Sequence, residues 1–190
     1  VLPDAARWAS NLTAALAALE DWAGAEEALQ SALALKPEPR SRVFLELNAA
    51  AIALGRGRSA EARKQYEAVL TGNPEQRTAR WQAEAGIANT LVAEKKFAEA
   101  RKHFDAALAV IEEGRSELNR NEYKLTFLAR LIRVYQDYVD FLVEQKDIEK
   151  ALAVAESSRA RLLAERNTVA ASRASSPREW PRNGKAVWLA

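Results

Sequence analysis

A four-residue pattern of side chains recurs along this chain at long intervals. An aromatic or otherwise apolar residue, replaced by Ser59 in one copy, is followed three positions later by alanine, four later by an apolar residue, and three later by a small one. Steps of three, four and three residues place all four side chains on one stripe of an α-helix. The copies are Trp22, Ala25, Leu29 and Ala32; Ser59, Ala62, Tyr66 and Val69; Phe97, Ala100, Phe104 and Ala107; and Ile148, Ala151, Ala155 and Ser158.

Each of these helices is preceded in the sequence by a second segment with helical apolar periodicity. The marker alanines are 37, 38 and 51 residues apart, and a pair of helices of about 34 residues cannot bury its own apolar face without stacking on a neighbour. The sequence therefore predicts an all-α fold, an α-solenoid of about four helix hairpins. The long last interval predicts an elongated first helix, from about 117 to 145, in the last hairpin. The expected repeats span about 6–37, 43–74, 81–112 and 117–166.

Composition supports a helical body. Gly and Pro together account for only 13 of the 190 residues, and alanine, which loses the least entropy in a helix, is abundant. Strand-like apolar residues gather only at 186–189. We therefore expect residues 1–170 to form the helical array, and 171–190 to form a linker with a possible first strand of a following domain.

The repeated positions resemble those of the tetratricopeptide repeat (TPR). In that family small residues occupy the eighth, twentieth and twenty-seventh positions and proline the thirty-second, as Pro37 and Pro74 do here. Asparagine stands at the sixth or ninth position, as Asn11, Asn48 and Asn89 do. The resemblance covers about 6–166 and implies a helical array that binds proteins or peptides. The resemblance is weakest in the second repeat. That repeat has Ser59 where the family usually has an aromatic residue, and Val69 where it usually has alanine.

A narrower resemblance lies at the end of the array. The segment 138–163 contains Tyr-Val-Asp-Phe-Leu, then Ile-Glu-Lys-Ala-Leu, then Ala-Glu-Ser-Ser-Arg-Ala-Arg-Leu-Leu. It is similar to the last TPR of bacterial proteins in which such repeats precede a CHAT domain, a caspase- and separase-like fold. The resemblance implies a docking or regulatory region whose catalytic histidine and cysteine lie outside this chain, and it makes the run around Trp188 the start of that domain.

The sequence contains few of the residue types that catalytic and metal-binding sites use. The chain has no cysteine and a single histidine, His103, which removes thiolate sites, cysteine nucleophiles and histidine clusters. His103 follows Arg101 and Lys102, and we expect it to be an exposed surface residue. We predict no catalytic residue, no metal site and no cofactor.

Protein binding is the predicted function. Helical solenoids bind along their concave face, which in the resembled family is lined by the first helix of each repeat. An apolar groove suits a helix or an extended segment, including one from the same polypeptide and its C-terminal domain. The alternative for Phe44 and Leu47 is simple packing on a neighbouring helix. The predicted surface comprises Arg7, Phe44, Leu47, Asn48, Gln82, Asn89, Arg133, Gln136 and Asp140.

A DNA-associated regulator is the competing hypothesis. It rests on residues 156–185, which hold seven Arg or Lys against three Glu. No phosphate loop or aromatic-basic strand accompanies this excess, so a solvated linker is the preferred interpretation and nucleic acid is not an expected partner.

The cellular location is predicted only in outline. No run approaches the roughly 20 apolar residues of a membrane helix, so we expect no membrane association and a cytoplasmic location. An upstream targeting signal stays open because the sequence begins at Val1 without methionine. The oligomeric state is not predicted.

Overall fold

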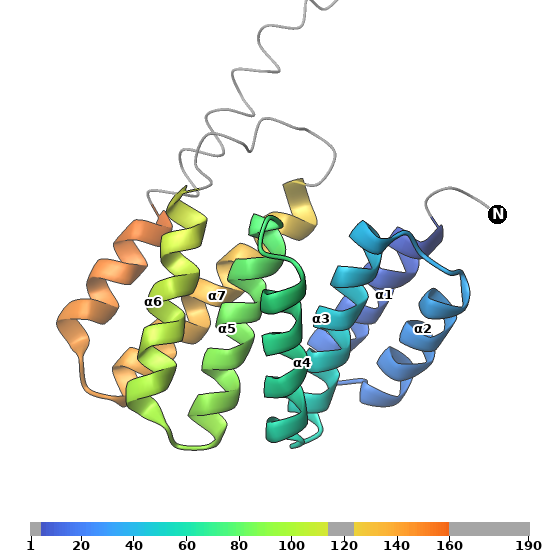
Figure 1. The fold of residues 1–190 in the computed structure, drawn as a ribbon. Helices are drawn as coiled ribbons and strands as arrows, with labels where there is room; N and C mark the ends of the chain where they lie inside the picture. The colour runs from blue at the N-terminus through green and yellow to red at the C-terminus, as the bar shows by residue number, and fades with distance from the viewer. Residues whose placement is uncertain (1–4, 114–123, 160–190) are drawn as a thin grey trace, which may run out of the picture.

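The described residues, 5–113 and 124–159 of a computed structural model, form helices joined by short turns, without a strand among them. The helix pairs follow one another in chain order, from α1 and α2 at one end to α7 and the helical residues 148–159 at the other (Figure 1). The predicted all-α class is confirmed for this part of the chain. The helices are α1 (Ala5–Ala18), α2 (Trp22–Ala34), α3 (Pro39–Gly55), α4 (Ser59–Gly72), α5 (Arg77–Ala93), α6 (Phe97–Glu113) and α7 (Lys124–Glu144).

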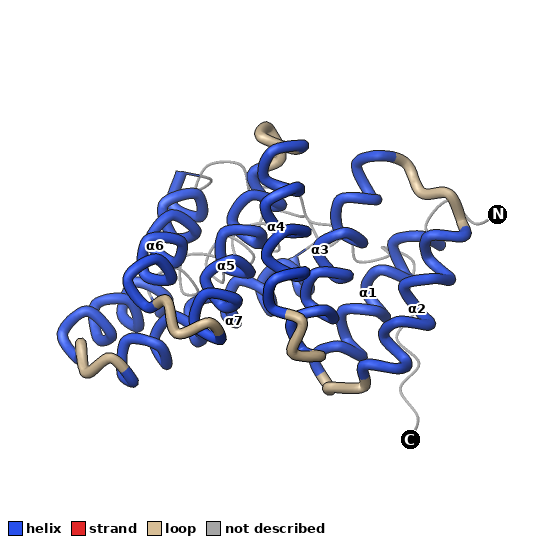
Figure 2. The backbone as a smooth tube through the Cα atoms, turned by 60° about the horizontal axis from the view of Figure 1, so that its bottom comes forward, coloured by secondary structure: helices blue, strands red, loops and turns tan. Residues whose placement is uncertain are grey.

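Consecutive helices pair as hairpins, and the hairpins stack on one another. The helix α1 packs on α2, α3 on α4, and α5 on α6, while the first helices also contact one another as α1–α3, α3–α5 and α5–α7. Figure 2 shows the same succession from a second direction, with short loops between the helices. The result is a repeat-like array in which each hairpin buries its apolar residues against the next.

Four turns share the same backbone geometry and mark the ends of the first helices of the repeats. Glu20, Gly57, Lys95 and Lys146 each have a positive φ, between 59° and 77°. In every case the amide of this residue bonds back to the carbonyl three residues earlier, and the next amide bonds to the carbonyl five residues earlier. These two bonds form a Schellman motif, which ends a helix and lets the chain reverse. The four turns are 37, 38 and 51 residues apart, as the marker alanines are.

The marker alanines lie at the helix crossings. Ala25, Ala62 and Ala100 are fully buried, and Ala151 is 4% exposed, so small side chains bring the helices close together. The residues at the first position of the predicted stripe are less buried than the alanines. Phe97 is 38% exposed, and its equivalents in the other three copies are also only partly covered. The stripe is therefore narrower than predicted.

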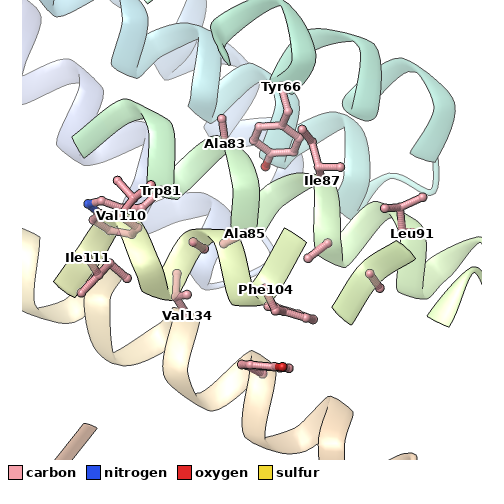
Figure 3. Close-up of a cluster of buried hydrophobic side chains, with 14 of the residues drawn as sticks. Tyr66, Trp81, Ala83, Ala85, Ile87, Leu91, Phe104, Val110, Ile111 and Val134 are labelled. Atoms are coloured by element: carbon pink, nitrogen blue, oxygen red, sulfur yellow. The ribbon is translucent and has the colours of Figure 1, made fainter. Parts of the chain in front are cut away.

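Glycine permits a close approach between hairpins. Gly86 is buried inside α5, and a Cβ built there would overlap ring atoms of Tyr66 from α4. Figure 3 shows this tyrosine beside Ala83 and Ile87 of α5. Further along, the ring of Phe104 stacks on that of Tyr138 with centroids 4.7 Å apart. Aromatic rings thus fill the spaces that small residues leave between helices.

Several predicted boundaries shift or lie outside the described residues. The second and third hairpins begin at Pro39 and Arg77, earlier than the predicted 43 and 81. The helix α7 has 21 residues and is the longest of the labelled helices, but the predicted part 117–123 lies outside the described residues, as do the linker and possible strand at 171–190.

Candidate binding surface

Polar side chains join the first helices of the first two hairpins. The amide nitrogen of Asn48, on α3, donates to the backbone oxygen of Ser10 at 2.9 Å and lies 3.2 Å from its hydroxyl oxygen. Both residues are only 6% exposed. Because a buried amide must be paired, this contact fixes how α1 and α3 sit together.

A second polar group joins α5 to α7. Arg130 Nη1 donates to Gln82 Oε1 at 2.8 Å, and Asn89 Nδ2 donates to Asp137 Oδ2 at 2.8 Å. The other carboxylate oxygen of Asp137 accepts from Arg133 Nε at 3.0 Å. Two amides on α5 therefore face two charged residues on α7, with the same seven-residue spacing on each helix.

Arg130 is the electrostatically unusual member of this group. It is half-buried, and burial lowers the pKa of its guanidinium below the ordinary value. Its partner Gln82 is neutral and is oriented by its own bond from Nε2 to Thr78 O, at 3.0 Å. Among the described residues no carboxylate forms an ion pair with Arg130. A guanidinium has five N–H donors, so most of its hydrogen-bonding capacity is left for a further acceptor.

The predicted surface residues fall into different environments. Leu47 is 4% exposed in the main apolar core, and Asn48 is buried against Ser10, so neither is accessible to a partner. For Leu47 the packing alternative is the correct one, because α3 is covered on both sides by neighbouring hairpins. Phe44 is partly buried against the same core.

The remaining predicted residues lie on α1, α5 and α7. Gln82 and Asn89 are half-buried, whereas Arg133, Gln136 and Asp140 are exposed on α7. Arg7 is in α1, and its side chain lies outside the described residues. The structure brings Asn89 and Arg133 together through Asp137.

Sequence reasoning missed Arg130, Asp137 and Ser10. The matching seven-residue spacing of Gln82 with Asn89 and of Arg130 with Asp137 is a signal that was present in the sequence. Which amide meets which charge depends on the stacking of two hairpins and is visible only in the fold.

His103 is not the freely exposed residue that was expected. Its Nδ1 lies 2.7 Å from Glu84 Oε2, between α6 and α5, and both side chains are partly buried. The described residues contain no group of three or more His, Cys, Asp or Glu side chains arranged to hold a metal ion. The contact is best explained as a link between the two helices of the third hairpin.

Comparisons with known proteins found no match to this chain. No family model matches the chain, and neither a curated protein nor a solved structure matches it significantly. Within the described helices, none combines the length and apolar character needed to cross a membrane.

Proposed function

We propose that this chain is a non-catalytic protein-interaction module of the TPR type, an α-solenoid that binds a peptide segment along its first helices. The observation that carries the proposal is Arg130, a half-buried cation that faces a neutral amide on the surface between α5 and α7. The recurring turns and the stacked hairpins support the repeat assignment.

The expected ligand is a peptide with an acidic side chain. A carboxylate pairs with guanidinium through two parallel hydrogen bonds, and this geometry is stronger than a bond to a neutral acceptor. Arg133, 68% exposed at its side chain, lies one turn further along α7, where Asp137 partly compensates its charge. Binding an anion at Arg130 offsets the desolvation that its burial has already cost.

The parent protein is the second part of the proposal. The resemblance of residues 138–163 to the repeat that precedes CHAT domains supports a docking role for this array, with the peptide ligand coming from the same polypeptide or from a partner. The coding sequence after residue 190 tests this directly. A strand-rich region with a histidine and a cysteine supports the proposal, and a DNA-binding motif contradicts it.

Peptide binding is tested by selection from a random-peptide phage library on the immobilised chain. The selected peptides are then synthesised and measured by fluorescence anisotropy with the wild type, Arg130→Gln and the control Lys64→Gln, which changes an exposed lysine on α4. We expect acidic peptides that lose roughly tenfold or more in affinity with Arg130→Gln, because a charge-assisted pair is removed, and that bind Lys64→Gln normally.

Two results would contradict this proposal. One is a selection that yields no convergent peptide. The other is a set of acidic peptides whose affinity is the same for Arg130→Gln and the wild type, since the cation would then lie outside the binding surface. Circular dichroism of each variant separates loss of binding from loss of fold.

DNA binding is not proposed. The basic segment 156–185 lies outside the described residues except for its first four positions. Within those four, Arg159 Nη1 donates to Glu156 at 3.2 Å, so this charge is partly compensated. No contact in the described part of the chain favours nucleic acid.

A further inference from the structure

The first helix of the array exposes large apolar side chains that its repeat equivalents bury. Trp8 and Leu12 of α1 are 67% and 54% exposed. The residue one repeat after Trp8 is Leu45, which is 1% exposed, and the residue two repeats after Leu12 is Ile87, which is 2% exposed. At these positions the side chains are therefore exposed in α1 and buried in α3 or α5.

The covering element is the second helix of the preceding hairpin. Leu45 and Ile52 of α3 form one apolar cluster with Ala25, Leu29 and Ala32 of α2. In the next junction Tyr66 of α4 lies against α5 at Gly86 (Figure 3). By repeat symmetry, the face of α1 that carries Trp8 and Leu12 is shaped to receive a helix of the same kind.

Ion pairs add a second contact at each internal junction. A charged residue in the second turn of each second helix reaches the turn between the two helices of the following hairpin. The pairs are Glu26 with Arg56 at 2.9 Å, Arg63 with Glu94 at 3.7 Å, and Arg101 with Asp147 at 2.6 Å.

Leucine replaces the charged residue at both ends of the array. Leu152 occupies the position of Glu26, Arg63 and Arg101 in the last helix and is 63% exposed. Leu19 occupies the position of Arg56 and Glu94 in the first turn and is 78% exposed. The two end faces thus lack the charges of an internal junction but carry apolar groups at the matching positions.

A second pair of positions on the two end faces also corresponds to a contact at an internal junction. At the first junction Trp22 lies against Gly55, where a Cβ would overlap its ring. The equivalent of Trp22 in the last helix is Ile148, 59% exposed, and the equivalent of Gly55 in α1 is Ala18. A large apolar side chain would again meet a small residue.

From these equivalences we propose that the chain self-associates head to tail, with residues 148–159 of one copy packed on α1 of the next. Leu152 then lies against Leu19, and Ile148 against Ala18, in the geometry of an internal junction. Such a contact is heterologous and leaves both outer ends free, so it builds an open series of copies rather than a closed dimer. It uses the end faces and does not depend on the peptide-binding surface proposed above.

The test measures the mass of the 190-residue chain against its concentration by sedimentation equilibrium. Two variants rebuild one internal ion pair across the proposed contact: Leu19→Arg supplies the charge of Arg56, and Leu152→Glu that of Glu26. We expect the wild type to associate increasingly with concentration. Each variant alone should associate at least about tenfold more weakly, because a charge is then buried without a partner.

Combining Leu19→Arg and Leu152→Glu in one chain should restore association, because the arginine of each copy then meets the glutamate of the next. The matched control is the double variant with Leu19→Glu and Leu152→Glu in one chain, in which like charges meet at every contact and association should stay weak. A further control, Lys64→Glu on exposed α4, should associate as the wild type does.

Three outcomes would overturn the proposal. A wild type that stays monomeric at every concentration would show that the head-to-tail contact does not form. Association that neither single variant weakens must use a different surface. Equal behaviour of the opposite-charge and like-charge double variants would show that positions 19 and 152 do not meet.

Discussion

The replacement of Gly86 by alanine tests a close approach between the second and third hairpins. Alanine in place of glycine inside a helix ordinarily stabilises it by about 1 kcal/mol. At Gly86 the new Cβ would overlap two ring atoms of Tyr66 and lie 2.6 Å from a third, Cε2. Tyr66 is only 5% exposed, so its ring has no free space to enter.

The overlap should outweigh the gain in helix propensity. Inserting a methyl group into a packed core costs about 1–3 kcal/mol, and the depth of this overlap places Gly86→Ala at the upper end. After the helix gain of about 1 kcal/mol, we expect a net loss of about 2 kcal/mol in the free energy of unfolding. Urea unfolding followed by far-UV circular dichroism measures this loss as a lower midpoint.

Gly72 supplies the matched control. It ends α4, and a Cβ there would meet nothing within 4 Å. Gly72→Ala should therefore be neutral or stabilise by up to about 1 kcal/mol. The Tyr66→Val background should also reduce the cost of Gly86→Ala, because the ring is gone. If Gly86→Ala is as stable as Gly72→Ala, the packing of Tyr66 on α5 is wrong.

The helical class and the repeat spacing were predictable because both depend on local pattern. Ala25, Ala62 and Ala100 recur at this spacing in α2, α4 and α6, and each is fully buried at a helix crossing. The turns themselves gave little signal. Glutamate and lysine occupy the positive-φ position at Glu20, Lys95 and Lys146, where glycine is the usual residue.

The environments of the candidate surface residues were less predictable, because they depend on contacts between hairpins. Leu47 and Asn48 were assigned to a groove from their place in a repeat, but neighbouring first helices pack closely enough to bury both. Arg130 and Asp137 were missed for the same reason. Their partners are 48 residues away in sequence, and no local pattern connects them.

Three further substitutions test the turns, the helix crossings and the inter-hairpin ion pairs. Gly57→Ala should cost about 1 kcal/mol at its positive φ, and Lys95→Gly should gain a similar amount, both measured by urea unfolding. Ala100→Leu should cost about 1–3 kcal/mol by overpacking a fully buried crossing, and an unchanged midpoint would count against the helix register. The last test uses pH. Arg101 donates a 2.6 Å hydrogen bond to Asp147, and this bond, followed by a backbone hydrogen bond from Lys150, holds the pKa of the Asp147 carboxyl below its ordinary value. A carboxyl with a lowered folded-state pKa stabilises the fold above the ordinary aspartate pKa of about 3.9, and this stabilisation is lost as pH falls through the folded value. Asp147→Asn should therefore unfold at lower urea than the wild type at neutral pH, and the two midpoints should converge in acid. A difference that stays constant from neutral to acidic pH would show that the charge of Asp147 contributes nothing to the junction.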